Sequence, residues 1–300
     1  MSKYDLSMTS TLVILGDSLV DAKNTFTLFS LAGQNPFEDD IYTGGGNTKA
    51  SDGLVLGEQI ASELGGSIDD MQNIPILSSE PAMEVDVHNY AHAGARSGTE
   101  PSFTLPTTGD SIGIGFKEQV RSFLNRADYY TDKEDVDVLI SCGGNDLRDA
   151  LELKDEIEAV AMTPTLKDDK QLSFNIAKPI AKNLKKSTRK IAELVDEIVI
   201  TGAPPVTETP EARDWSLSFD KEIRNRALDI IDRARNKVHK KVNKYFADED
   251  NVFVVDGSEA WQKLENPSFV DTIHPDTKTS QTLAEIIAPE ASDTLVTFGF

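Results

Sequence analysis

The 300-residue sequence contains a single cysteine, Cys142, so no disulfide can form within the chain. Cys142 ends an apolar run, which is typical of a buried and unreactive thiol. Cys and His do not cluster with the spacing of a zinc site, and we expect neither a metal nor an organic cofactor. Apolar runs are short as well, and none approaches the roughly 18 residues that a membrane span needs. The sequence therefore predicts no integral membrane segment.

Positive charge is scarce, because 30 Lys and Arg stand against 51 Asp and Glu, a formal net charge of −21. Nucleic acids and anionic membrane surfaces call for basic patches, so this balance argues against both partners. The first 15 residues hold one lysine, an early aspartate and a short apolar run, unlike a secretory signal peptide. We expect a cytoplasmic protein, one exported without such a peptide, or a sequence that lacks that segment.

Short apolar runs alternate with amphipathic stretches along the chain. The five apolar runs are predicted to be strands: 11–15, 85–91, 136–142, 197–202 and 251–257. Near-continuous apolar character indicates strands covered on both faces, as in a parallel sheet. The amphipathic stretches are predicted to be helices: 51–66, 116–130, 181–197, 220–247 and 277–288. This alternation predicts an α/β sandwich, and with no repeat or linker in sight we expect one domain, 1–300.

Glycines and polar residues follow the predicted strands, where ligands of parallel sheets bind. Ser18 follows the first run, Gly94 the second and Asn145 the third. A serine there can act as a nucleophile, and backbone N–H groups and an amide can stabilise an oxyanion. The glycines are equally consistent with simple tight turns.

A serine nucleophile needs a base, and the chain has four histidines. His239 lies in a charged helix, His88 lies within a strand, and His92 has no acid at a useful spacing. His274 follows Asp271 by three residues, so one tight turn can bring the carboxylate to Nδ1 and leave Nε2 for a serine. A turn capped by these two side chains is an equally good interpretation of the spacing alone.

Four short motifs occur in a fixed order: Gly-Asp-Ser-Leu at 16–19, Gly94 within "NYAHAGA", Asn145 within "GGND", and Asp271 and His274 within "DTIH". In this order they resemble the GDSL-type lipases and esterases of the SGNH hydrolase superfamily. The motifs span residues 16–274, so the resemblance covers nearly the whole chain. The stretches 51–61 and 199–206 are similar to the lecithinase, haemolysin and plant-lipase branch.

The resemblance implies a flavodoxin-like three-layer α/β/α sandwich with five parallel strands. It implies that Ser18 is the nucleophile and that His274 is its base, oriented by Asp271. The N–H groups of Ser18 and Gly94 and the amide of Asn145 would form the oxyanion hole.

Two other motifs compete with this assignment. The stretch 109–113 reads G-x-S-x-G, but the nucleophile elbow needs a strand before it, and here the preceding residues are typical of a loop. The stretch 44–51 suggests a phosphate-binding loop, but it lacks the glycine before Lys49 and a preceding strand. Ser111 and Lys49 are therefore not expected in the site.

The sequence predicts a metal-independent serine hydrolase of a small-molecule or lipid carboxylic ester. Acyl transfer to another alcohol at the same site, or a binding protein that keeps the fold without catalysis, are the alternatives. Aromatic residues in loops, Phe37, Phe103 and Trp215, either line an acyl pocket or pack the loops themselves.

Overall fold

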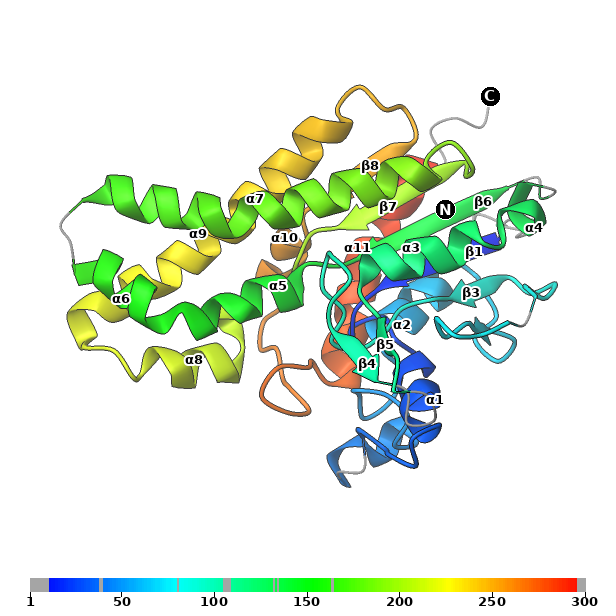
Figure 1. The fold of residues 1–300 in the computed structure, drawn as a ribbon, viewed down its shortest axis with the longest axis horizontal. Coiled ribbons are helices and arrows are strands. Elements are labelled where there is room, and N and C mark those ends of the chain that lie inside the picture. Colours follow the sequence, from blue (N-terminus) through cyan, green and yellow to red (C-terminus); the bar gives the residue numbers. More distant parts are fainter. Residues whose placement is uncertain are drawn as a thin grey trace.

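The central sheet has six strands, and every neighbouring pair in it is parallel. The structure is a computed structural model, and it describes residues 11–37, 40–79, 81–104, 109–131, 133, 135–162 and 165–295. The strands are β1 (Thr11–Gly16), β2 (Gln72–Asn73), β3 (Val87–Asn89), β6 (Val136–Ser141), β7 (Glu197–Thr201) and β8 (Val252–Val255). Their spatial order is β2-β3-β1-β6-β7-β8 (Figure 1).

The prediction of five strands is wrong by one, because β2 was not recognised. β2 has only two residues, Gln72 and Asn73, and it pairs with β3 at the edge of the sheet. A two-residue polar strand has no apolar run, so no pattern in the sequence distinguishes it from a loop. The other five strands match the five predicted runs, although β3 is shorter than its run.

Helices cover both faces of the sheet, which confirms the predicted three-layer α/β/α sandwich (Figure 1). One face carries α3 (Phe116–Leu124), α4 (Ala127–Thr131), α5 (Gly144–Arg148), α6 (Lys154–Met162), α7 (Leu166–Ile191) and α9 (Lys221–Phe246). The other face carries α2 (Leu56–Glu63), α10 (Gly257–Gln262) and α11 (Thr277–Leu295). Short elements in the connections are α1 (Asn24–Ser30), η1 (Asp40–Gly45), η2 (Asp149–Leu153), η3 (Val206–Glu208), α8 (Pro210–Ser216) and the ribbon of β4 (Ser102–Thr104) with β5 (Ser111–Gly113).

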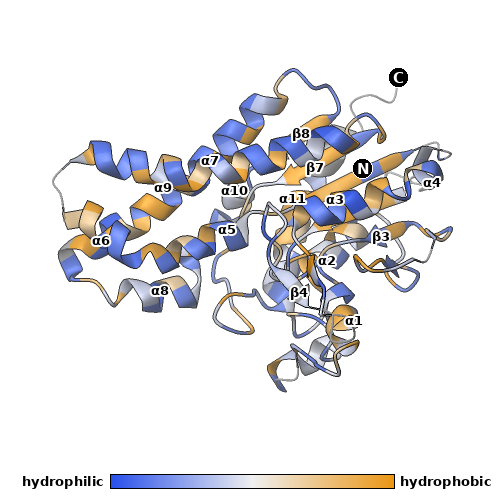
Figure 2. Ribbon diagram, viewed as in Figure 1, coloured by the Kyte–Doolittle hydropathy of each residue, from blue (hydrophilic) through white to orange (hydrophobic). Residues whose placement is uncertain are grey.

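Two apolar cores lie on opposite sides of the sheet. Successive side chains of a strand point to opposite faces, so β1 sends Val13 and Leu15 into one core and Leu12 and Ile14 into the other. All six residues of β1 are buried, and the neighbouring strands β7 and β8 are among the most continuously apolar elements (Figure 2). This double burial explains why the strands appear in the sequence as uninterrupted apolar runs.

The order of the strands determines where a site can form. Without the edge strand β2, the order is that of a flavodoxin-like sheet, which reverses its winding between β1 and β6. The loops that leave β1 and β6 diverge there and open a crevice at the carboxyl edge. Ser18 follows β1 and Asn145 follows β6, so both predicted site residues lie at this crevice.

Candidate active site

Gly16, the last residue of β1, brings Ser18 to the carboxyl edge of the sheet. Its φ is +154°, and a Cβ atom there would lie 2.1 Å from the carbonyl oxygen of Ser141 on β6, so only glycine fits. The buried Gln119 of α3 accepts the Gly16 N–H at 2.8 Å and donates its amide to the Gly16 carbonyl at 2.7 Å. The turn that presents Ser18 is therefore held from both sides.

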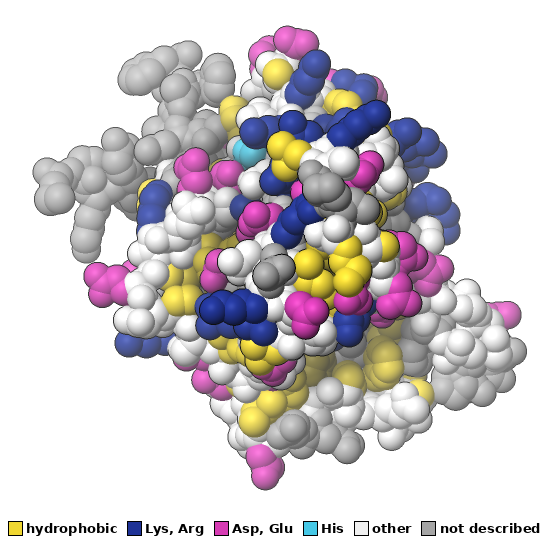
Figure 3. Space-filling view, turned by 90° about the vertical axis from the view of Figure 1, so that its left-hand side faces the viewer, with side chains coloured by type: hydrophobic (Ala, Val, Ile, Leu, Met, Phe, Trp, Pro, Cys, Tyr) yellow, Lys and Arg dark blue, Asp and Glu magenta, His cyan; other side chains and the backbone are white. Residues whose placement is uncertain are grey.

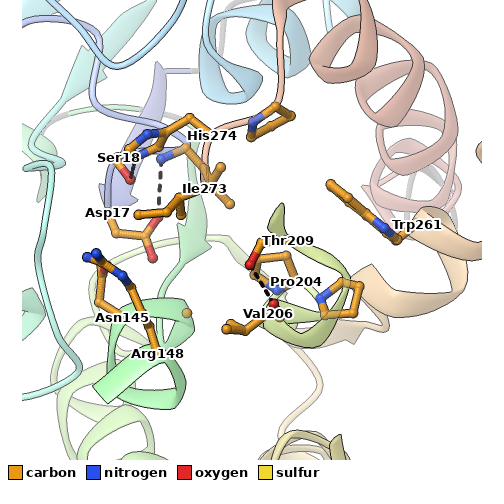
Figure 4. Close-up of a pocket in the computed structure, with 14 residues that line it drawn as sticks. Asp17, Ser18, Asn145, Arg148, Pro204, Val206, Thr209, Trp261, Ile273 and His274 are labelled. Atoms are coloured by element: carbon orange, nitrogen blue, oxygen red, sulfur yellow. Dashed lines mark hydrogen bonds between the residues drawn. The ribbon is translucent and has the colours of Figure 1, made fainter. Parts of the chain in front are cut away.

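Asp271 and His274 form one tight turn after β8. The Oδ1 atom of Asp271 accepts the backbone N–H groups of Ile273 and His274, both at 2.6 Å. Its Oδ2 atom lies 2.5 Å from Nδ1 of His274. Nε2 of His274 in turn lies 2.8 Å from Oγ of Ser18 (Figure 4). The structure thus brings these three predicted residues into one hydrogen-bonded chain across 256 positions of sequence.

Tyr42, from η1, is a fourth member of this chain that the sequence analysis missed. Its hydroxyl donates to Oδ2 of Asp271 at 2.6 Å. Burial alone would raise the pKa of Asp271, but hydrogen bonds from His274 and Tyr42 and the adjacent imidazole outweigh burial. They hold the pKa of Asp271 well below its usual value, so Asp271 is an ionised acceptor. Nδ1 of His274 must then carry the proton, which leaves Nε2 free to accept the Ser18 hydroxyl.

The loop after β3 is bound to α5 and to the first residue of η2 through three pairs of residues. Nδ2 of Asn145 donates to the Ala95 carbonyl at 3.0 Å. Asp146 accepts the N–H and the hydroxyl of Ser97, each at 2.7 Å, and Asp149 accepts the guanidinium of Arg96. These contacts hold the segment that contains Gly94 next to Asn145.

Gly94 itself has φ +79°, a conformation that favours glycine, so a turn is needed here whatever its further role. Asn145 lines the same cavity as Ser18 and His274, whereas Gly94 is not among the described residues that line it. The structure therefore brings Ser18, His274, Asp271 and Asn145 to one site, with Gly94 in the adjoining loop. The oxyanion role of Gly94 stays a prediction.

An apolar cavity opens beside Ser18 and His274, with about 510 Å³ of empty space including its mouth (Figure 4). Its apolar wall is formed by Leu19, Pro204, Pro205, Val206, Trp261, Ile273 and Pro275. Arg148 lines the cavity too, and Glu211 holds its guanidinium through two hydrogen bonds of 2.6 and 2.7 Å. The N–H of Glu211 donates to the Thr272 carbonyl at 2.9 Å, which joins α8 to the turn that carries His274. The cavity can hold an apolar group next to the Ser18 hydroxyl.

Asp17 adds a titratable group to the cavity wall. Its carboxyl is buried, and its Oδ1 accepts the Leu19 N–H at 3.2 Å. Burial raises the pKa of Asp17 to about 7, against the smaller lowering effects of that hydrogen bond and of His274. Near neutral pH this carboxyl is therefore only partly ionised.

The other candidates from the sequence lie elsewhere. Ser111 is exposed in the antiparallel β4–β5 ribbon, and Lys49 forms a buried ion pair with Glu58 of α2 at 2.6 Å. Trp215 packs against Phe219 and donates its indole N–H to Leu151, so the aromatic residue of the cavity is Trp261 instead. Phe37 packs edge-on against Tyr42, whereas the Phe103 side chain falls outside the described part of the structure.

His239 is half-buried and lies 3.8 Å from Asp256, and His88 is bonded to Met83 and Tyr130. Within the described ranges, no group of three or more His, Cys, Asp and Glu side chains could hold a metal ion. No helix in those ranges is long and apolar enough to cross a membrane.

Comparison with known proteins identifies the family. The profile of the GDSL-like Lipase/Acylhydrolase family matches residues 12–287, so the chain belongs to this family and is a carboxylic ester hydrolase. No protein in the curated collection matches.

Solved structures with a similar fold include the extracellular lipase of Streptomyces rimosus, at 13% identity and TM-score 0.46 over 94% of this chain and 99% of that one. An acetylxylan esterase of Geobacillus stearothermophilus shares 16% identity at TM-score 0.42, over 93% of each chain. A putative SGNH hydrolase of Slackia heliotrinireducens shares 12% identity at TM-score 0.40, over 93% of this chain and 97% of that one.

Proposed function

We propose that the protein is a serine esterase that cleaves its ester through an acyl-enzyme on Ser18. The observation that carries this proposal is the hydrogen-bonded chain from Asp271 through His274 to Ser18, 2.5 and 2.8 Å long, at an apolar cavity. An isolated serine hydroxyl is a poor nucleophile at neutral pH, and an imidazole with a free Nε2 lone pair is the base that activates it.

In the first half-reaction, Oγ of Ser18 attacks the ester carbonyl while its proton passes to Nε2 of His274. The carbonyl oxygen becomes an oxyanion, and we assign its stabilisation to the N–H groups of Ser18 and Gly94 and to the amide of Asn145. An amide nitrogen carries two N–H groups, so the one that is not bonded to Ala95 can donate to this oxyanion. The tetrahedral intermediate collapses, and the leaving alkoxide takes the proton from His274.

In the second half-reaction, a water molecule gives a proton to His274 and attacks the acyl group on Ser18. Collapse of this intermediate returns the proton to Oγ of Ser18 and releases the carboxylic acid. Asp271 keeps His274 in the tautomer that both halves need. The apolar wall of Pro204, Val206 and Trp261 favours an apolar acyl or alcohol group over a charged one.

A fluorophosphonate probe tests the nucleophile directly. The probe should label Ser18, the label should vanish in Ser18→Ala, and it should weaken strongly in His274→Ala, as peptide mapping by mass spectrometry can measure. The matched control is Ser111→Ala, which changes the other serine of a Gly-Asp-Ser triplet and should label like the wild type. An adduct on the Ser111 peptide would overturn the assignment, as would the absence of both an adduct and turnover of a p-nitrophenyl ester.

A further inference from the structure

Positive charge is concentrated on two helices, although the chain as a whole is acidic. Helices α7 and α9 comprise 52 residues, and they hold 17 of the chain's 30 Lys and Arg but only 5 of its 51 Asp and Glu. An even spread would place about five Lys and Arg there. These helices therefore carry a net charge of +12, while the other 248 residues carry −33.

Most of the cations gather on one side of the molecule, because α7 and α9 pack side by side. Two arginines are exceptions, since Arg235 is buried near Asp256 and Arg189 pairs with Glu249. The stretches 178–190 and 233–244, which we call the basic face, contain twelve Lys and Arg and no Asp or Glu. On α7 every fourth residue is an exposed lysine: Lys178, Lys182, Lys186 and Lys190. Lys178 of α7 and Lys241 of α9 lie over the same Phe174 ring, 5.7 and 4.9 Å from its centroid. Figure 3 shows Lys and Arg side chains gathered along the upper part of the molecule, where these helices lie.

This arrangement costs stability, which argues for a role beyond solvation of a helix surface. Like charges four residues apart destabilise a helix, whereas ordinary surface helices alternate opposite charges. Within the described residues, no carboxylate pairs with Lys182, Lys186 or Lys240. Burial and the repulsion of Arg233, Lys170 and Lys241 lower the pKa of Lys237, so the crowding of cations extends across both helices.

We propose that the basic face docks the protein on an anionic lipid surface. Two helices of 26 residues, each about 39 Å long, present a broad face. Nine of the twelve cations are lysines, compact point charges that suit the diffuse charge of lipid headgroups. Nucleic-acid recognition more often uses the planar fork of arginine. An ester hydrolase also gains access to lipid esters when it binds the surface that contains them.

The net charge of −21 does not prevent this docking. At about 0.1 M salt the screening length is about 10 Å, so carboxylates on distant parts of the protein contribute little at the basic face. The average charge therefore describes the chain, whereas binding depends on the local charge of the surface that meets the lipid.

Vesicle flotation tests the proposal. The probe is a vesicle of phosphatidylcholine with about 30% phosphatidylglycerol, compared with phosphatidylcholine alone. Wild-type protein should float with the anionic vesicles only, and less so as salt is raised. The triple variant Lys182→Glu, Lys186→Glu, Lys240→Glu should lose about 100-fold in partition, because each lysine near such a surface contributes roughly fivefold.

The matched control is Lys23→Glu, Lys263→Glu, Lys278→Glu, which makes the same change in net charge at exposed lysines outside the basic face. It should float like the wild type. No flotation of the wild type, or an equal loss in both triple variants, would overturn the proposal. So would binding to double-stranded DNA by the basic face without binding to vesicles.

The docking proposal rests on the proposed ester hydrolysis only for its biological role. Separate measurements test lipid binding and ester hydrolysis, so either proposal can be refuted without the other. All three proteins should hydrolyse a soluble p-nitrophenyl ester at equal rates. Flotation without any ester hydrolysis would refute the proposed function and leave the docking surface supported. Ester hydrolysis without flotation would refute the docking surface and leave the proposed function supported.

Discussion

Replacement of Asp271 by asparagine should stop turnover by moving one proton. Oδ1 of Asp271 accepts two backbone N–H groups, from Ile273 and His274, so the asparagine must keep its oxygen there. Its NH2 group then replaces Oδ2 and faces Nδ1 of His274. Since NH2 can only donate, Nδ1 must become an acceptor, and the ring proton moves to Nε2. His274 would then donate to Ser18 and could not accept its proton.

We expect kcat of Asp271→Asn to fall by about 10⁴, equivalent to about 5 kcal/mol of transition-state stabilisation, with KM little changed. The matched control is Tyr42→Phe, which removes one hydrogen bond to the same Oδ2 atom but leaves the tautomer intact. A single hydrogen bond contributes about 1 kcal/mol, so this variant should lose no more than about tenfold.

The assay is steady-state hydrolysis of a p-nitrophenyl ester, with thermal unfolding to verify that both variants fold. The tautomer argument predicts a difference of about 10³ between the two variants. If Asp271→Asn loses less than tenfold, or if both variants lose the same amount, the tautomer argument is refuted.

Three further predictions concern other residues. Asn145→Ala should lower kcat by about 10²–10³ with KM nearly unchanged, because its amide acts on charge that forms only in the transition state; a change confined to KM would contradict this role. Gln119→Leu should lower both the melting temperature and kcat, since it leaves the two backbone groups of Gly16 without their buried partner. Burial and repulsion by Asp196 raise the pKa of Asp137 to about 6, so its contribution to stability is lost as pH rises from about 4 through 6. Asp137→Asn should therefore be about 1–2 kcal/mol more stable than the wild type at pH 8 and similar to it at pH 4, by thermal unfolding; equal curves at pH 8 would refute this.

The parts of the structure that local patterns encode were predictable. Strands buried on both faces appear as apolar runs, and the three-residue spacing of Asp271 and His274 produces the observed turn. Ser18 could be placed because an apolar strand ends directly before it. By contrast, β2 is too short and polar to leave a pattern. The predicted helix 181–197 omits residues 166–180 of α7, which has Pro179 in its interior, where proline is usually excluded.

Tyr42 and Gln119 could not be predicted, because their roles are contacts across 229 and 103 positions that no local spacing records. The basic face is a different case, since its signal was present in the sequence. The charge of the whole chain, −21, does not reveal the excess of Lys and Arg on these helices, whereas a charge count for each predicted helix does.

The site residues come from two parts of the chain, one before α7 and one after it. Each part also contributes its own contiguous block of strands to the sheet. Ser18 and Asn145 follow strands that precede α7, and Asp271 and His274 follow β8, the last strand of the sheet. A break between β6 and β7 would separate β2, β3, β1 and β6 from β7 and β8, which are contiguous blocks in the sheet order. Neither fragment would hold both Ser18 and His274, so under the proposed mechanism ester hydrolysis would appear only on reassembly. The protein could thus serve as a split reporter, in which turnover measures the proximity of two partners fused to its fragments.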